Sequence, residues 1–154
     1  MNKRNIQLRI TLFTLLIILP FAQSAFGEYV AIVQEKANIR SKPGVSSPLL
    51  YTMNHSLNYP LRVLKRSGRW LKVKDYEGDS GWIAKFLTSR INAVIVKKKA
   101  HVRNGPGTQF KNLWTAVKGE TFRVIEKKGS WLHVIDSVEN RGWIYKKLLW
   151  GATN

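Results

Sequence analysis

Residue types that could carry out chemistry are few in this sequence, and they do not cluster. There is no cysteine among the 154 residues, which excludes disulfides, thiolate metal sites and a cysteine nucleophile. The histidines His55, His101 and His133 lack the His-x-His or His-x-x-x-His spacing of a metal pair. The residues therefore predict no enzyme, no metal site and no cofactor.

Acidic residues gather in one segment, Asp75-Tyr76-Glu77-Gly78-Asp79. A carboxylate pair that hydrolyses a glycoside should flank a cleft, whereas a short acidic stretch around a glycine is typical of a solvated turn. A Ca²⁺ site is the alternative. The corresponding segment later in the chain, Asp136-Ser137-Val138-Glu139-Asn140, differs enough to argue against a shared metal.

Tryptophans are more informative, because their surroundings are polar. Side chains alternate across a strand, so in the segment from Trp70 to Lys74 we expect Leu71 and Val73 in the core. The outer face then carries Trp70, Lys72 and Lys74. The segment Trp131-Leu132-His133-Val134 repeats this pattern, with Trp131 and His133 outside. A tryptophan on a polar face predicts a binding platform; the alternative is a rim residue that covers the barrel edge or packs on the other repeat.

Other candidates stand at equivalent positions in the two halves of the chain. Tyr51 and Trp114 could serve either the core or a ligand, whereas Trp82 and Trp143, each between Gly and Ile, are interpreted as structural. Arg40 and Arg103 begin Pro-Gly loops, in which Pro fixes φ and Gly permits positive φ; the arginine could also reach an acidic ligand. The predicted ligand-binding residues are Trp70, Lys72, Trp131, His133, Tyr51, Trp114, Arg40 and Arg103.

These residues lie on short β-type runs separated by turn residues. The first half predicts strands over Tyr29 to Val33, Asn38 to Arg40, Leu49 to Met53, Leu61 to Lys65, Trp70 to Lys74 and Gly81 to Ala84. No stretch of ten or more residues after Phe26 keeps a helical period. Strands of this length and spacing are typical of a small antiparallel barrel or sandwich.

The same pattern occurs twice. AIVQEKANIRSKPG (31–44) aligns with VIVKKKAHVRNGPG (94–107), RVLKRSGRWLKVKD (62–75) with RVIEKKGSWLHVID (123–136), and GWIAKFL (81–87) with GWIYKKL (142–148). The offset changes by two residues between the first and second blocks, so the first copy has a longer connection around Asn54 to Tyr59. The chain therefore contains an internal duplication.

The order of these motifs resembles the bacterial SH3 (SH3b) domain family. The resemblance covers Tyr29 to Leu87 and Ala93 to Leu149, and the second copy is similar to the variant found in exported proteins of Gram-negative bacteria. It implies a five- to six-stranded SH3-like barrel that serves as a targeting or binding module, often for cell-wall peptides or glycan. No peptidase or amidase domain is recognised beside it, so we expect a stand-alone protein. The aromatic signature for proline-rich peptides is missing, so PxxP recognition is not implied.

The first residues are typical of a secretory signal peptide. Lys3, Arg4 and Arg9 precede the apolar run ITLFTLLIILPF (10–21) and the small-residue segment AQSAFG (22–27). Cleavage is expected after Gly27, or alternatively after Ser24. An uncleaved anchor is the other interpretation, but a spanning helix needs about 20 apolar residues. The expected location is the periplasm or cell envelope.

Charge and organisation complete the prediction. The chain has 26 basic and 9 acidic residues, a net charge of +17, and most of the excess lies after the signal peptide. Such a field favours anionic partners. We expect an all-β protein: signal-peptide helix 1–27, SH3b-like barrels 28–89 and 90–150, and tail 151–154.

Three functional classes remain open, and an enzyme ranks below all three. A module that binds peptidoglycan or another anionic envelope polymer comes first. A scaffold that docks an envelope protein is the alternative. Nucleic-acid binding is third, because the signal peptide argues against it and DNA retention would be nonspecific. A membrane is expected to be contacted only transiently, through the signal peptide.

Overall fold

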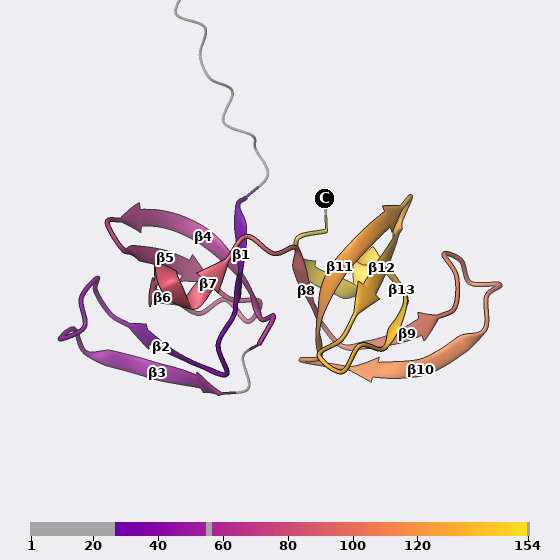
Figure 1. Cartoon of the computed structure of the whole chain (residues 1–154), viewed down its shortest axis with the longest axis horizontal. Coiled ribbons are helices and arrows are strands. Elements are labelled where there is room, and N and C mark those ends of the chain that lie inside the picture. Colours follow the sequence, from indigo (N-terminus) through magenta and orange to yellow (C-terminus); the bar gives the residue numbers. More distant parts are fainter. Residues whose placement is uncertain (1–26, 55–56, 154) are drawn as a thin grey trace, which may run out of the picture.

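The computed structural model describes residues 27–54 and 57–153. These residues form two seven-stranded antiparallel sheets, and each sheet curls around its own core (Figure 1). They contain no α-helix, only the 3₁₀ turns η1 (Lys85–Leu87) and η2 (Lys146–Leu148). The prediction of an all-β chain with two tandem barrels is confirmed, whereas the signal-peptide helix lies outside the described residues.

The strands of the first barrel follow the predicted runs closely. They are β1 (Tyr29–Ile32), β2 (Lys36–Arg40), β3 (Leu49–Asn54), β4 (Pro60–Ser67), β5 (Trp70–Lys74), β6 (Ser80–Ala84) and β7 (Thr88–Ser89). Their order in the sheet is β3-β2-β6-β5-β4-β1-β7. Thr88 and Ser89, the last residues of the expected first barrel, thus form a short strand that pairs with β1.

The second barrel repeats this order as β10-β9-β13-β12-β11-β8-β14. Its strands are β8 (Ala93–Val96), β9 (Lys99–Arg103), β10 (Asn112–Val117), β11 (Thr121–Lys128), β12 (Trp131–Ile135), β13 (Arg141–Tyr145) and β14 (Leu149–Gly151). The short strands β7 and β14 extend each sheet beyond the five or six strands expected. Across the described part of the chain, no helix has the length and hydropathy needed to cross a membrane.

Alternation along the central strands places the aromatic residues as expected. Leu71 and Val73 are buried in the first core, and Leu132 and Val134 in the second. The intervening Trp70, Lys72, Trp131 and His133 are half-buried on the outer faces. Because hydrophobic burial scales with apolar area, these inward residues fix which side of each strand faces solvent.

A bulge between β4 and β5, and its counterpart between β11 and β12, sets the register of the outer face. The pairing of β4 with β5 shifts between Val63 and Lys65, and that of β11 with β12 shifts between Val124 and Glu126. The extra residues, Leu64 and Ile125, are about half exposed. A bulge inserts one residue into one strand, so Lys65 and Glu126 both return to the outer face.

A glycine at the start of β6 and of β13 allows the sheet to close. A Cβ on Gly142 would overlap Val102 Cγ1 and lie 3.0 Å from the Arg103 carbonyl oxygen, and a Cβ on Gly81 would overlap Ile39 Cγ2. Both glycines are buried. The Gly-Trp-Ile motif therefore marks the point where one strand crosses closely over another.

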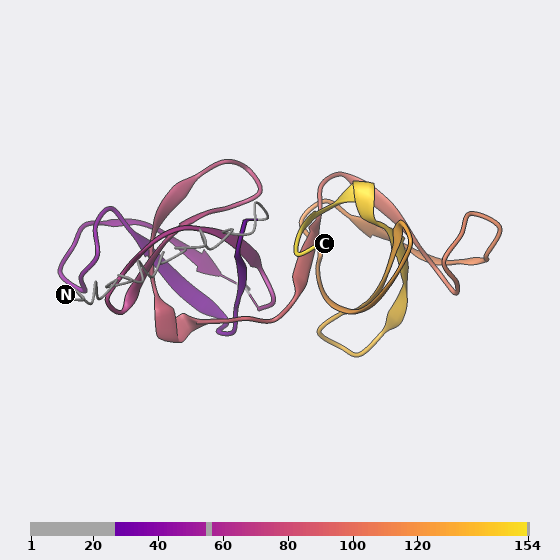
Figure 2. The same ribbon diagram turned by 90° about the horizontal axis from the view of Figure 1, so that it is seen from above.

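The two barrels touch along their inner sides, with the loops β2–β3 and β9–β10 directed away at opposite ends (Figures 1 and 2). Tyr29 meets Trp150 edge-on with ring centroids 5.2 Å apart. Lys118 Nζ lies 3.0 Å from Glu77 Oε1 and 5.6 Å from the Tyr76 ring centroid. The bond lowers the pKa of Glu77 and raises that of Lys118. The two barrels are therefore joined by specific contacts between side chains.

The glycine crossing makes a prediction about stability. Gly142→Ala should lower the free energy of unfolding by about 1–3 kcal/mol, the usual cost of overpacking a filled core. Urea unfolding followed by tryptophan fluorescence measures this free energy. Lys99→Ala, at an exposed position of β9, is the control. Equal midpoints for the two variants would show that β13 does not press on β9.

Candidate binding site on the second barrel

The candidate site begins with two aromatic side chains on neighbouring strands. Trp131 opens β12 and pairs directly with Tyr145, the last residue of β13. Their ring centroids are 5.6 Å apart with the planes tilted by 50°. Both side chains are half-buried. Two rings in this arrangement form an open apolar wall with polar edges, as an aromatic binding surface requires.

The loop between β9 and β10 covers one side of this wall. Arg103 braces the loop, because its Nη1 donates a 2.7 Å hydrogen bond to the Phe110 carbonyl oxygen. Arg40 makes the same 2.7 Å bond to the Ser47 carbonyl oxygen in the first barrel. Gly107 does not have the expected positive φ, although Gly44 does, at 138°. The Gly107 Cβ position is instead occupied by the side chain of Gln109.

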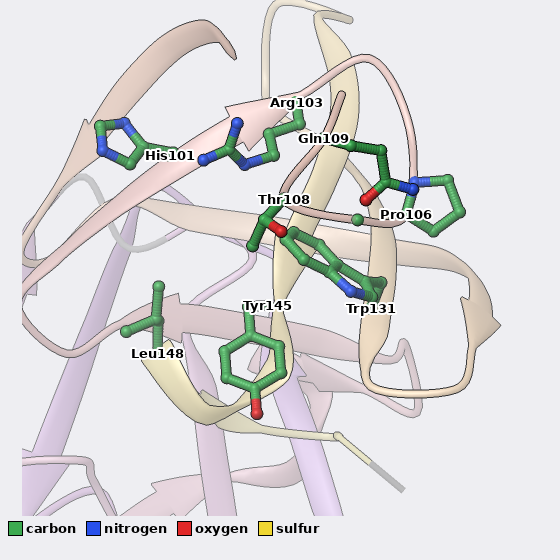
Figure 3. A pocket seen from close by; sticks show the side chains of 9 residues that line it. His101, Arg103, Pro106, Thr108, Gln109, Trp131, Tyr145 and Leu148 are labelled. Atoms are coloured by element: carbon green, nitrogen blue, oxygen red, sulfur yellow. The ribbon is translucent and has the colours of Figure 1, made fainter. Parts of the chain in front are cut away.

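Wall and loop enclose a hollow of about 600 Å³. Figure 3 shows Trp131 and Tyr145 below the loop residues Thr108 and Gln109, with His101 and Arg103 on β9 at the far side. Pro106, Gly107 and Leu148 complete the lining. The wall formed by Trp131 and Tyr145 is the aromatic floor of this hollow. The hollow thus combines this floor with one fixed cation and several hydrogen-bonding side chains, a composition typical of a ligand pocket.

His133 lies beside this hollow and contacts other residues. Its ring stacks on Trp143, with centroids 4.8 Å apart and planes 9° from parallel. Its Nδ1 is 3.9 Å from Glu126 Oε2 on the next strand. Trp143, interpreted from the sequence as structural, therefore supports a predicted ligand-binding residue on the outer face.

The remaining predicted residues fall into two groups. Tyr51 and Trp114 pack against the two cores. Burial, followed by the charges of Asp75 and Asp79, raises the pKa of Tyr51 to about 12. Trp114 lines a separate hollow with Thr121 and Asp136. The structure therefore brings Trp131 and Arg103 into one site, with His133 next to it, and holds Tyr51 and Trp114 apart from them.

Trp70, Lys72 and Arg40 occupy the equivalent outer face of the first barrel, but the partner of Trp70 differs. Trp70 pairs with Ala84, where the second barrel has Tyr145. The loop residues Thr108 and Gln109 are Val45 and Ser46 in the first copy. The aromatic wall is therefore a property of the second barrel.

The two acidic segments form turns. Asp75 Oδ1 accepts hydrogen bonds from the backbone N–H groups of Glu77, Gly78 and Asp79 at 2.9–3.0 Å. Asp136 Oδ1 accepts from Val138 and Asn140 in the second barrel, each at 2.9 Å. Within residues 27–54 and 57–153, no group of three or more potential ligand side chains could hold a metal ion.

Sequence reasoning missed several residues of the hollow, namely His101, Thr108, Gln109, Tyr145 and Leu148. One signal could have found Tyr145: the strands that begin at Trp131 and end at Tyr145 are adjacent and antiparallel, which places these two residues opposite each other. The others belong to the loop or to positions whose direction depends on the curl of the barrel.

Fold and site together define a tandem pair of small β-barrel modules with an aromatic hollow on the second. Family models described as "Bacterial SH3 domain" match residues 35–88 and 96–151. The chain belongs to the bacterial SH3 domain family and contains two such domains in tandem, as the sequence motifs predict.

Relatives of known name are longer than this chain. It is 26% identical over 133 residues to the "Putative N-acetylmuramoyl-L-alanine amidase YrvJ" of Bacillus subtilis. The matched segment covers 79% of this chain and 25% of that relative. Among solved structures, NlpC2 from Trichomonas vaginalis is 11% identical with a TM-score of 0.36, covering 81% of this chain and 48% of that one. An NlpC/P60 family protein from Bacillus cereus is 14% identical with a TM-score of 0.36, covering 79% and 55%. The chain thus spans a quarter of the amidase and about half of each solved protein.

The arginine brace makes a prediction about the loop. Arg103→Met should remove about 1 kcal/mol of hydrogen-bond energy and speed hydrogen exchange of the loop amides about fivefold, measured by mass spectrometry. Arg123→Met, an exposed arginine on β11, is the control. Unchanged exchange in the Arg103 variant would show that the loop holds its shape without the brace.

Proposed function

We propose that this chain is a non-catalytic binding protein of the bacterial cell envelope, and that its second barrel recognises peptidoglycan. The observation that carries the proposal is the hollow in which Trp131 and Tyr145 form a floor beside Arg103. An aromatic floor suits the apolar faces of sugar rings and of alanine side chains. The cation beside it suits a carboxylate of a stem peptide.

Arg103 can serve both the loop and a ligand. A guanidinium carries five N–H donors, and one of them holds the loop through a hydrogen bond to the Phe110 carbonyl oxygen. Arg103 also lines the hollow, together with His101 and Gln109. A ligand carboxylate at this point would meet a cation whose position is already fixed, which reduces the ordering cost of binding.

Charge and relatives support the same polymer. The net charge of +17 favours an anionic, carboxylate-bearing wall. The relative named as an amidase acts, by that name, on N-acetylmuramoyl-L-alanine, a part of peptidoglycan. The bacterial SH3 family and this relative suggest an extracytoplasmic location, and the N-terminal segment suggests export to the periplasm or cell envelope.

The proposal predicts that Trp131→Ala weakens sedimentation of the protein with purified peptidoglycan. Truncation of a central aromatic contact commonly costs 2 kcal/mol or more, so we expect a Kd raised by about thirtyfold. Tyr145→Ala should act in the same direction, because it removes the other half of the floor. Circular dichroism checks that both variants remain folded.

Trp70→Ala is the matched variant, because Trp70 is the residue of the first barrel equivalent to Trp131. Its cross-strand partner is Ala84, so the first barrel has no second ring at this place. It should weaken sedimentation much less than Trp131→Ala. If the double variant of Trp70 and Trp131 sediments as the unchanged protein does, the site is wrong.

A scaffold that docks an envelope protein is the second candidate. It is favoured by the contacts that join the barrels, above all the Tyr29–Trp150 pair and the Lys118–Glu77 ion pair. A rigid pair of barrels presents a preorganised surface. Cross-linking in cell extract that captures one protein stoichiometrically, with no retention on peptidoglycan, would favour this function over polymer binding.

A further inference from the structure

Four side chains form a line across the outer face of the first barrel. Lys65 on β4 pairs with Lys72 on β5, Lys72 pairs with Trp82 on β6, and Trp82 pairs with Arg40 on β2. Cross-strand partners share one face of a sheet, and neighbouring strands lie about 4.8 Å apart. We name Lys65, Lys72, Trp82 and Arg40 the cationic row.

The second barrel has a different set at the same positions. There the line is Glu126, His133, Trp143 and Arg103. Glu126 and His133 lie 3.9 Å apart and His133 stacks on Trp143, so that row is occupied by its own contacts. Two of the three cations in the cationic row, Lys65 and Lys72, thus replace an acid and a histidine.

No ion pair between described residues neutralises the cationic row. Among residues 27–54 and 57–153, the ion pairs of the first barrel join Glu28 to Arg66 and Arg90, and Glu77 to Lys118. None involves Lys65, Lys72 or Arg40. Next to the row, Arg62 lies opposite Lys74, a second like-charge pair. Like charges directly opposite on a sheet destabilise it, and a bound anion would relieve that repulsion.

We propose that the cationic row is a second binding site, which holds carboxylates of the same polymer that the second barrel binds. The identity of the polymer rests on the proposed function. Lysine ammonium groups bind anions as point charges without a fixed geometry. They suit flexible carboxylates that repeat along a chain more than one precisely shaped ligand.

The placement of the two sites favours a polymer over a short ligand. The cationic row ends at Arg40, which is bonded to the β2–β3 loop, and the hollow lies under the β9–β10 loop. These loops point to opposite ends of the molecule (Figures 1 and 2). Only an extended ligand can occupy both sites, and joint occupation raises its avidity.

The test uses the full protein and purified peptidoglycan, either untreated or with its carboxylates converted to amides. The variant Lys65→Gln/Lys72→Gln should bind untreated peptidoglycan about fivefold more weakly, as the loss of two charge contacts at the surface implies. Its affinity should also depend less on salt. Amidation should weaken the unchanged protein more than it weakens the variant, because the variant keeps only the proposed carboxylate contact of Arg103.

Lys98→Gln/Lys99→Gln is the control, since it removes the same charge from exposed positions in the second barrel. Lys65→Glu/Lys72→His transplants the row of the second barrel, which folds with those residues, and should bind more weakly still. The inference is overturned if the Gln variant binds as the control does, or if amidation leaves binding of the unchanged protein intact. Loss of binding in Trp131→Ala with an unaffected Gln variant would remove this inference and keep the proposed function. Loss of binding in the Gln variant with an unaffected Trp131→Ala would keep the cationic row as a site and remove the hollow from the proposed function.

Discussion

The close crossing of β6 over β2, and of β13 over β9, is the contact on which the rest of each barrel depends. At this point the tryptophan after the glycine pairs with the loop arginine, Trp82 with Arg40 and Trp143 with Arg103. A side chain in place of Gly81 or Gly142 would overlap the core, so the sheet could not bend back on itself there. The crossing continues the outer face from β4 to β2 as one surface, and the loop arginine becomes its last member.

That surface explains how one duplicated fold supports two different sites. The inward residues are similar in the two copies, because Leu71 and Leu132 fill equivalent positions in two close-packed cores. Outward residues carry no such packing constraint. The small Ala84 lies opposite Trp70, whereas the large Tyr145 lies opposite Trp131. Lys72 occupies the position equivalent to His133, which stacks on Trp143. The outer faces of the two copies therefore differ in chemistry without a difference in fold.

Much of the fold could be predicted from the sequence, because it follows from local patterns. Alternation placed Leu71 inside and Trp70 outside, and the strand Trp70–Lys74 has the predicted bounds. The bulges at Leu64 and Ile125 could not be predicted, since an exposed leucine in a strand does not reveal an extra residue. Those bulges decide that Lys65 faces Lys72. Equivalence in sequence also suggested that Trp70 and Trp131 act alike, whereas the cross-strand partners Ala84 and Tyr145 separate them.

The contacts between the barrels decide how these differences can be used. Tyr29 against Trp150 and Lys118 against Glu77 hold the inner sides together, and the ligand-facing loops consequently point apart. With the loops at opposite ends, one small molecule does not bridge them (Figures 1 and 2). They can hold two places on one long chain, where the effective concentration of the second contact is set by the polymer. We propose that the two barrels divide the work, since the cationic row on the first barrel would provide retention along the polymer and the aromatic hollow on the second would provide recognition.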